Sequence, residues 1–197
     1  MIAGVAPSAP EDPDVTRVSL VARPSLLVAR MCRLMPGLKT LRVFWSSESS
    51  RADVDELARA GSAVGVAVVS TRVEAPSALP ETLRAIKDRG DAFWLMPDPT
   101  LVDAANFAVL REYAAASKTP FFAPTEGLAQ LGASATLAVP FREMGRVAAA
   151  VARARLAGKT VAPVVWADKV VVTVNARAAS GCGLAEPAQG AADRTIP

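Results

Sequence analysis

The stretch Leu41–Ser50 (LRVFWSSESS) sets a short, mostly apolar run directly before a run of polar residues. The chain repeats this arrangement five times, with the apolar runs at Leu41–Trp45, Val66–Ser70, Ala92–Met96, Pro120–Ala123 and Ala135–Val139. Apolar runs of this length are typical of parallel strands that helices cover on both faces. Strands that alternate with helices predict an α/β fold, a three-layer sandwich built on a mostly parallel, doubly wound sheet of five strands.

Amphipathic stretches fill the intervals between these runs and predict helices. They cover about Pro24–Leu34, Arg51–Ala63, Glu81–Lys87, Leu101–Ala116 and Phe141–Leu156, with a short helix ending near Leu131. Further along, Val164–Ala167 and Lys169–Val174 predict a strand pair joined by a tight turn at Asp168. Asn175 then opens a last helix, Ala176–Cys182.

The length of the chain and the composition of its ends divide the sequence into three parts. A chain of 197 residues suits one domain. Its first residues are rich in Pro, Ala and Asp and predict mostly loop before Val18–Val21, whereas the Pro, Ala, Gln and Gly after Leu184 favour disorder. We therefore expect an extended N-terminal segment (1–23), one α/β lobe (24–184) and a disordered tail (185–197).

The residue types available argue against catalysis. The sequence holds no histidine, so Ser–His and Cys–His nucleophile pairs are impossible and the commonest metal ligand is missing. Asp53, Asp55 and Glu56 fall on a helix face that we expect to be exposed, and no pair of carboxylates has a spacing that demands acid–base or metal chemistry. We predict no enzymatic activity, no catalytic residue, no metal and no cofactor.

Charge and hydropathy limit the partners and the compartment. The net charge is only +3 and aromatic residues make up 5%, which argues against nucleic-acid binding. No apolar run reaches the length of a membrane span, and Met1–Pro10 lacks the pattern of a secretory signal, so the chain as written is expected in the cytoplasm. Cys32 and Cys182 are either small buried thiols or a disulfide, and the sequence leaves both open.

The polar ends of the apolar runs are the candidate ligand-binding residues, because ligands bind outside the carboxyl ends of parallel strands. In the order of the strands they follow, they are Ser46, Ser47 and Ser50, then Asp98 and Thr100, then Thr125 and Glu126, and finally Phe141. Hydroxyls and free amides at a helix start bind anionic groups, and an aromatic ring lines apolar pockets. The alternative is helix capping for the polar residues and core packing for the aromatic one.

Six stretches of the chain, in this order, carry a resemblance to a known family: Met1–Val5 with Leu34–Lys39, Leu41–Ser47, Asp91–Val102, Thr119–Glu126, Gly132–Gly145 and Val170–Leu184. Together they resemble the second lobe of ABC-transporter substrate-binding proteins of the type-I periplasmic fold. The subfamily with the greatest likeness is the tryptophan- or amino-acid-binding one. The chain departs from its pattern at Pro99-Thr100, where the family has an Asp-Asn pair.

The resemblance implies a protein of two lobes that close on a small molecule, of which this chain holds only the second. It implies solute binding for an ABC-type importer, with an amino acid as the kind of ligand, a permease as a partner and a periplasmic location. The second reading is a cytosolic ligand-sensing or interaction domain that forms a homodimer through the open cleft face. A third reading, a flavodoxin-like enzyme, has no supporting motif.

Overall fold

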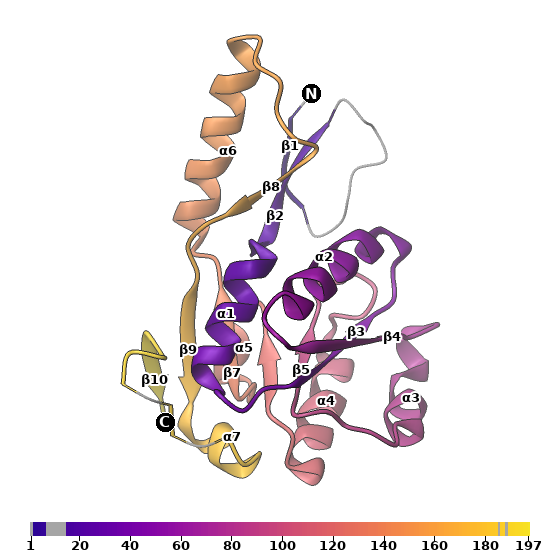
Figure 1. Cartoon of the computed structure of the whole chain (residues 1–197). Helices are drawn as coiled ribbons and strands as arrows, with labels where there is room; N and C mark the ends of the chain where they lie inside the picture. Colours follow the sequence, from indigo (N-terminus) through magenta and orange to yellow (C-terminus); the bar gives the residue numbers. More distant parts are fainter. Residues whose placement is uncertain (1, 7–14, 185, 188) are drawn as a thin grey trace.

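The computed structural model of the chain describes residues 2–6, 15–184, 186–187 and 189–197 (Figure 1). In chain order the elements are β1 Ile2–Ala6, β2 Thr16–Ala22, α1 Pro24–Leu34, β3 Thr40–Trp45, η1 Glu48–Ser50, α2 Arg51–Ser62, β4 Ala67–Arg72, η2 Pro76–Ala78, α3 Leu79–Ala85, β5 Ala92–Leu95, α4 Ala104–Ser117, β6 Phe121–Ala123, α5 Gly127–Gln130, β7 Ala135–Ala138, α6 Phe141–Leu156, β8 Val164–Ala167, β9 Val171–Asn175, α7 Ala176–Gly181 and β10 Arg194–Ile196. The five expected strands correspond to β3, β4, β5, β6 and β7.

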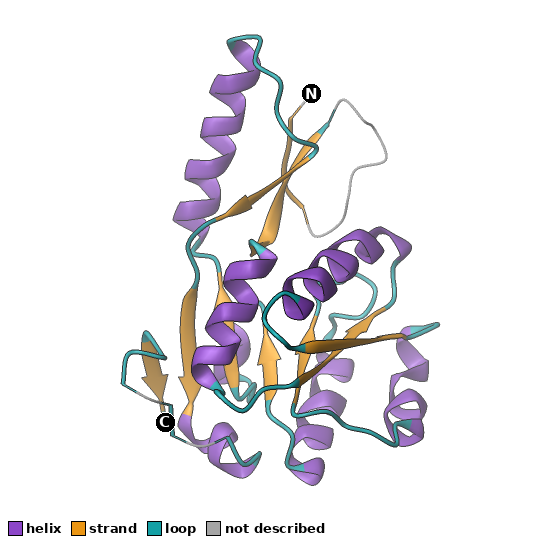
Figure 2. Ribbon diagram, viewed as in Figure 1, coloured by secondary structure: helices purple, strands orange, loops and turns teal. Residues whose placement is uncertain are grey.

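A seven-stranded sheet in the order β10-β9-β7-β6-β5-β3-β4 forms the centre of the molecule. All neighbouring strands in it are parallel except β7 and β9. Helices cover both faces (Figure 2). One face packs Leu27, Leu57 and Trp94 into a core beneath α1 and α2, and the other packs Phe93 and Phe121 beneath α3 and α4. The predicted α/β sandwich is confirmed. The sheet contains β9 and β10 in addition to the five expected strands.

A second, three-stranded sheet in the order β1-β2-β8 extends beyond the main sheet together with α6 (Figure 1). The two expected C-terminal strands form, but the prediction that they pair with each other is wrong. Strand β8 pairs with β2 in parallel, and β9 pairs with β7. The chain passes from one sheet to the other at Asp168. That carboxylate accepts a hydrogen bond of 2.8 Å from Nε of Arg23, at the start of α1, so the expected turn is a crossover between sheets.

The N-terminal segment is more regular than its composition indicates, since the part expected to be mostly loop contains β1 and the start of β2. Residues 1 and 7–14 of that segment lie outside the described residues. Within β2, Arg17 is 1% exposed and donates two hydrogen bonds, of 2.8 and 2.6 Å, to the carboxylate of Asp53 on α2. Asp53 is thus buried, which corrects the expectation that it lies on an exposed helix face.

The C-terminal tail also forms structure where disorder was expected. Strand β10 lies parallel to β9, with Arg194 opposite Thr173. The side chain of Asp193 accepts a hydrogen bond of 2.8 Å from the backbone N–H of Val172 and another from Arg30. The expectation of disorder is therefore wrong for this part of the tail, while residues 185 and 188 lie outside the described residues.

Two further sequence questions have structural answers. Cys32 and Cys182 are both free thiols, so the disulfide alternative is not realised, and burial raises the pKa of each. Among the described residues, no helix combines the length and the apolar character that crossing a membrane requires.

Candidate ligand-binding site at the carboxyl edge of the sheet

The topology places all the sequence-derived candidates along one edge of the main sheet. Strands β3, β5, β6 and β7 are neighbours and run parallel, so the loops that follow them emerge on the same side. Strand β9 is antiparallel to β7, with Val171 opposite Ala138, so its first residues reach this edge as well. The edge divides into a half after β3 and β5 and a half after β6 and β7.

Asp98 organises the half of the edge that follows β3 and β5. Its Oδ2 accepts hydrogen bonds from the backbone N–H of Ser46 (3.0 Å) and of Ser47 (2.7 Å) and from the hydroxyl of Ser50 (2.8 Å). Its Oδ1 accepts one of 2.9 Å from the backbone N–H of Thr100. Asp98 is fully buried, so its carboxylate serves the protein's own donors. Asp98 therefore has the structural role expected from the sequence as the alternative to ligand binding, except that it caps backbone N–H groups of two loops and not the start of a helix.

The electrostatics of Asp98 follow from this arrangement. Burial alone raises the pKa of a carboxyl group, because it disfavours the charged form. The hydrogen bonds from Ser46, Ser47, Ser50 and Thr100 favour the charged form and outweigh burial, so the pKa of Asp98 lies below its ordinary value. A stable buried anion therefore joins the loops that follow β3 and β5.

Few polar groups remain available in this half. Ser46 and Ser50 are buried, and Ser47 shares a hydrogen bond of 2.6 Å with the hydroxyl of Ser49. Thr100 is exposed, but it does not cap the next helix, because α4 begins at Ala104 with Asp103 as its cap. The amides expected to bind an anionic ligand are thus already occupied by Asp98.

A charged cluster on Trp45 adjoins the serines. The guanidinium groups of Arg51 and Arg72 lie 5.7 and 5.5 Å from the centre of the Trp45 ring. Both also pair with Glu48, at 2.5 and 3.3 Å. Cation–π contacts and ion pairs of this kind hold the loop after β3 in place. The sequence pattern did not reveal this cluster, because Arg72 lies on another strand.

The half of the edge after β6 and β7 is open. A hollow of about 290 Å³ lies there, lined by Leu20, Pro124, Thr125, Glu126, Gly127, Ala138, Val139, Pro140, Phe141, Met144 and Val171. Three of the sequence candidates, Thr125, Glu126 and Phe141, meet in it. Phe141 begins α6 and is 83% exposed, so the alternative that it packs in the core is wrong. The walls combine apolar side chains with one hydroxyl and one carboxylate, which is the usual composition of a small-molecule pocket.

Glu126 has a partner that sequence reasoning missed. Its carboxylate forms an ion pair with Arg194 on β10, and both side chains are about half exposed. Arg194 follows Glu126 by 68 residues and lies in the segment expected to be disordered. No local sequence signal connects the two residues.

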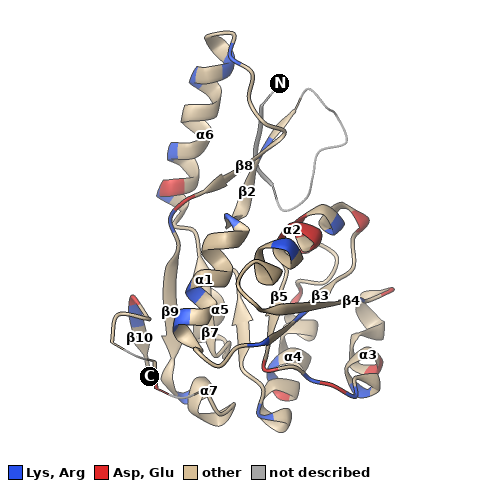
Figure 3. Cartoon of the chain, viewed as in Figure 1, with Lys and Arg blue, Asp and Glu red and all other residues tan. Residues whose placement is uncertain are grey.

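Basic and acidic residues lie side by side next to this hollow, where α6 begins and the β8–β9 connection passes (Figure 3). An adjoining hollow of about 460 Å³ is lined by Pro140, Arg142, Glu143, Arg146 and Lys169. Glu143 pairs with Arg146 at 2.6 Å, and the hydrogen bond from Arg146 holds the pKa of Glu143 below its ordinary value. Within the described part of the chain, no carboxylate lies within ion-pair distance of Arg142 or Lys169. The lining of the adjoining hollow therefore carries more positive than negative charge.

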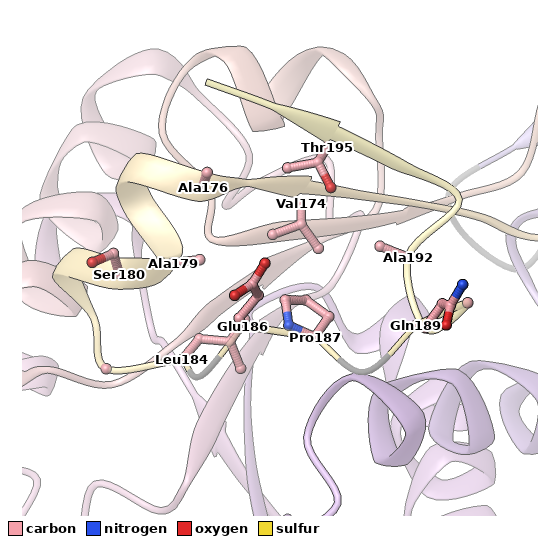
Figure 4. A pocket seen from close by; sticks show the side chains of 12 residues that line it. Val174, Ala176, Ala179, Ser180, Leu184, Glu186, Pro187, Gln189, Ala192 and Thr195 are labelled. Carbon is pink, nitrogen blue, oxygen red and sulfur yellow. The ribbon is translucent and has the colours of Figure 1, made fainter.

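A larger hollow, of about 650 Å³, lies away from this edge (Figure 4). It opens between α7, β9, β10 and the tail, and its walls include Val174, Ala179, Leu184 and Thr195. It contains none of the sequence-derived candidates. In the described residues, no group of three or more Cys, Asp or Glu side chains could hold a metal ion.

An α/β layer with polar loops gathered at the carboxyl edge defines a lobe of the periplasmic-binding-protein type, and the comparisons with known proteins agree. Residues 11–188 match the family of ABC transporter substrate-binding proteins, and the chain belongs to that family. No curated protein sequence matches the chain.

Several solved structures share the fold. The ABC domain from Streptococcus pneumonia in complex with L-Trp is 20% identical with a TM-score of 0.70, over 98% of this chain and 68% of that one. A conserved domain protein from Vibrio cholerae is 21% identical with a TM-score of 0.70, over 93% of this chain. The ligand-free, open substrate-binding protein from Clostridium difficile is 20% identical with a TM-score of 0.64, over 97% of this chain. The chain spans 63% of the Vibrio protein and 65% of the Clostridium protein.

Proposed function

We propose that the chain binds a small organic solute in the hollow formed by Thr125, Glu126 and Phe141, as part of the solute-binding component of an ABC-type importer. The exposed ring of Phe141 is the observation that carries this proposal. It is 83% exposed at the open half of the carboxyl edge, in a chain of the substrate-binding protein family. Substrate-binding proteins of this family bind their ligands without chemical conversion, so we propose no catalytic step.

An amino acid, an aromatic one first of all, is the ligand class that fits best. A bound ring packed on Phe141 would gain about 0.5–1.5 kcal/mol beyond the area it buries. Thr125 offers a hydroxyl to the polar end of the ligand. The L-Trp named for the Streptococcus structure supports an amino acid as the ligand class.

Closure of a second lobe over Phe141 would complete the pocket. A hollow of about 290 Å³ lies at the small end of ligand pockets, and one wall cannot enclose most of a ligand's surface. The matched solved structures are longer than this chain, which supports a second wall outside it. A permease partner and a periplasmic or extracellular location are part of this proposal and follow from the family.

Isothermal titration calorimetry of the protein against the twenty amino acids tests the proposal. We expect saturable heat with one or a few of them, and Phe141→Ala to weaken that binding at least tenfold. Leu131→Ala is the matched control, because Leu131 is also exposed and apolar but follows α5, at the opposite edge of the sheet. The proposal fails if no amino acid produces heat or raises Tm, or if both variants lose binding equally.

The second candidate, self-association through the same face, also rests on the exposed Phe141. It predicts a stable dimer in sedimentation velocity that Phe141→Ala converts to a monomer. The positive surface formed by Arg142 and Lys169 disfavours this arrangement, because a symmetric contact at this face would bring like charges together. A monomer that binds a solute would exclude it.

A further inference from the structure

We propose that Arg194, on the C-terminal strand β10, determines the charge selectivity of the candidate solute site by neutralising Glu126. The site would then accept zwitterionic, neutral or anionic solutes and reject solutes with a cationic side chain. This inference rests on the proposed function, because it assigns a ligand class to the same hollow. Arg194 lies outside residues 11–188, the part of the chain that matches the family.

The strand that carries Arg194 is held in place by several contacts. Its backbone pairs with β9 at three positions: Arg194 with Thr173, Thr195 with Val174 and Ile196 with Asn175. Just before it, the backbone N–H of Asp193 donates a hydrogen bond of 2.9 Å to the carbonyl of Val172. The Asp193 carboxylate in turn accepts a hydrogen bond of 2.8 Å from the backbone N–H of Val172. Arg194 is therefore presented from an ordered strand.

The alternation of side chains along β10 directs Arg194 toward Glu126. Thr195 faces the large hollow under the tail (Figure 4). Its neighbour Arg194 therefore faces the other side of the sheet. Asn175, which shares a face of β9 with Thr173, donates a hydrogen bond of 2.8 Å to the carbonyl of Ala129 in α5, so α5 lies on that side. Glu126 directly precedes α5 and meets Arg194 there.

The ion pair changes what the hollow can attract. Glu126 is the only carboxylate among the described residues that line the hollow, and an unpaired carboxylate there would bind an ammonium or guanidinium group. With Arg194 in place, a cationic solute must displace a cation that is tethered to the sheet. Arg142 and Lys169, in the adjoining hollow, add further positive charge. The resulting field favours solutes that present a carboxylate without a second cation.

Affinities for solutes of similar size and different charge provide the test. We would measure dissociation constants of leucine, lysine and glutamate for the wild-type protein and for Arg194→Gln. We expect Arg194→Gln to raise the affinity for lysine relative to leucine at least tenfold, and the double variant Arg194→Gln/Glu126→Gln to abolish that gain. Arg177→Gln removes another exposed arginine, on α7, and should leave the ratio unchanged.

Two further variants keep the test informative if Arg194→Gln disturbs the tail. Arg194→Lys retains the charge and should keep the wild-type ratio, and Glu126→Gln alone should raise the affinity for glutamate relative to leucine. The inference is overturned if leucine binds and the lysine-to-leucine ratio of Arg194→Gln stays within twofold of the wild type. If none of the three solutes binds any protein while another amino acid does, the same ratios are measured on charged analogues of that amino acid. The absence of all amino-acid binding overturns the proposed function and this inference together.

Discussion

The two halves of the carboxyl edge contain similar residue types and differ in what those residues contact. After β3 and β5, Asp98 is buried and binds Ser46, Ser47, Ser50 and Thr100. After β6 and β7, Glu126 and Phe141 are exposed around a hollow. The comparison shows that a polar residue at the end of a strand can either be buried and hold the loops together or remain exposed at the surface. The first half joins two loops of the edge, and the second half is the surface that we propose for binding.

Removal of Asp98 should have the largest effect on stability. Asp98→Ala would leave the backbone N–H of Ser46 and the hydroxyl of Ser50 without an acceptor in a buried place. Hydrogen bonds to a charged group contribute about 1.5–3 kcal/mol each, and unsatisfied buried donors add a further cost. We expect a loss of about 3–5 kcal/mol in the free energy of unfolding, measured by urea denaturation. A loss below about 1 kcal/mol would show that Asp98 does not join the two loops.

The contribution of Asp98 should also depend on pH in a defined direction. Because the folded-state pKa of Asp98 is lowered, its stabilisation is fully present above the unfolded value of about 3.9 and is lost as the pH falls through the folded pKa. The difference in unfolding free energy between the wild type and Asp98→Asn should therefore be constant above about pH 5 and shrink below pH 4. A difference that stays constant from pH 6 to pH 2 would contradict the hydrogen-bond assignment.

The open half should tolerate the same kind of change. Phe141 is 83% exposed and the Glu126–Arg194 pair is about half exposed, so neither contributes much to folding. We expect Phe141→Ala and Glu126→Gln each to change the free energy of unfolding by no more than about 0.5 kcal/mol in urea. A loss similar to that of Asp98→Ala would remove the contrast between the two halves.

The sequence predicted the parts of the fold that depend on local pattern. Four of the five apolar runs identified β3, β5, β6 and β7 because both faces of those strands are buried, whereas the run at β4 forms a largely exposed edge strand. Helices α1 and α6 begin and end where their patterns do. Asp53 was misplaced because its partner, Arg17, lies 36 residues away on a strand that composition did not reveal. Strand β10 was missed because its order comes from pairing with β9.

The sequence predicted at which edge of the sheet the candidate residues lie, but not which contacts their side chains make. The order of strands and helices brings Ser46, Asp98, Thr125 and Phe141 to one side of the sheet, and this follows from parallel topology alone. The partner of each acidic residue depends on the conformation of the loops and of the tail. Asp98 reaches two amides and a hydroxyl across a loop, whereas Glu126 meets a guanidinium from the tail. Neither contact has a sequence signature.

Helix α6 joins the hollow to the small sheet in a way that has a mechanical consequence. It is continuous over 16 residues, from Phe141 to Leu156, and so is about 24 Å long. Its first residue lines the hollow, and its body packs against β1, β2 and β8. Because a continuous helix moves as one body, a tilt of α6 imposed by a solute at Phe141 would also shift the strands outside the main sheet that α6 packs against. The same helix would thus contact the ligand and transmit its binding to the three-stranded sheet.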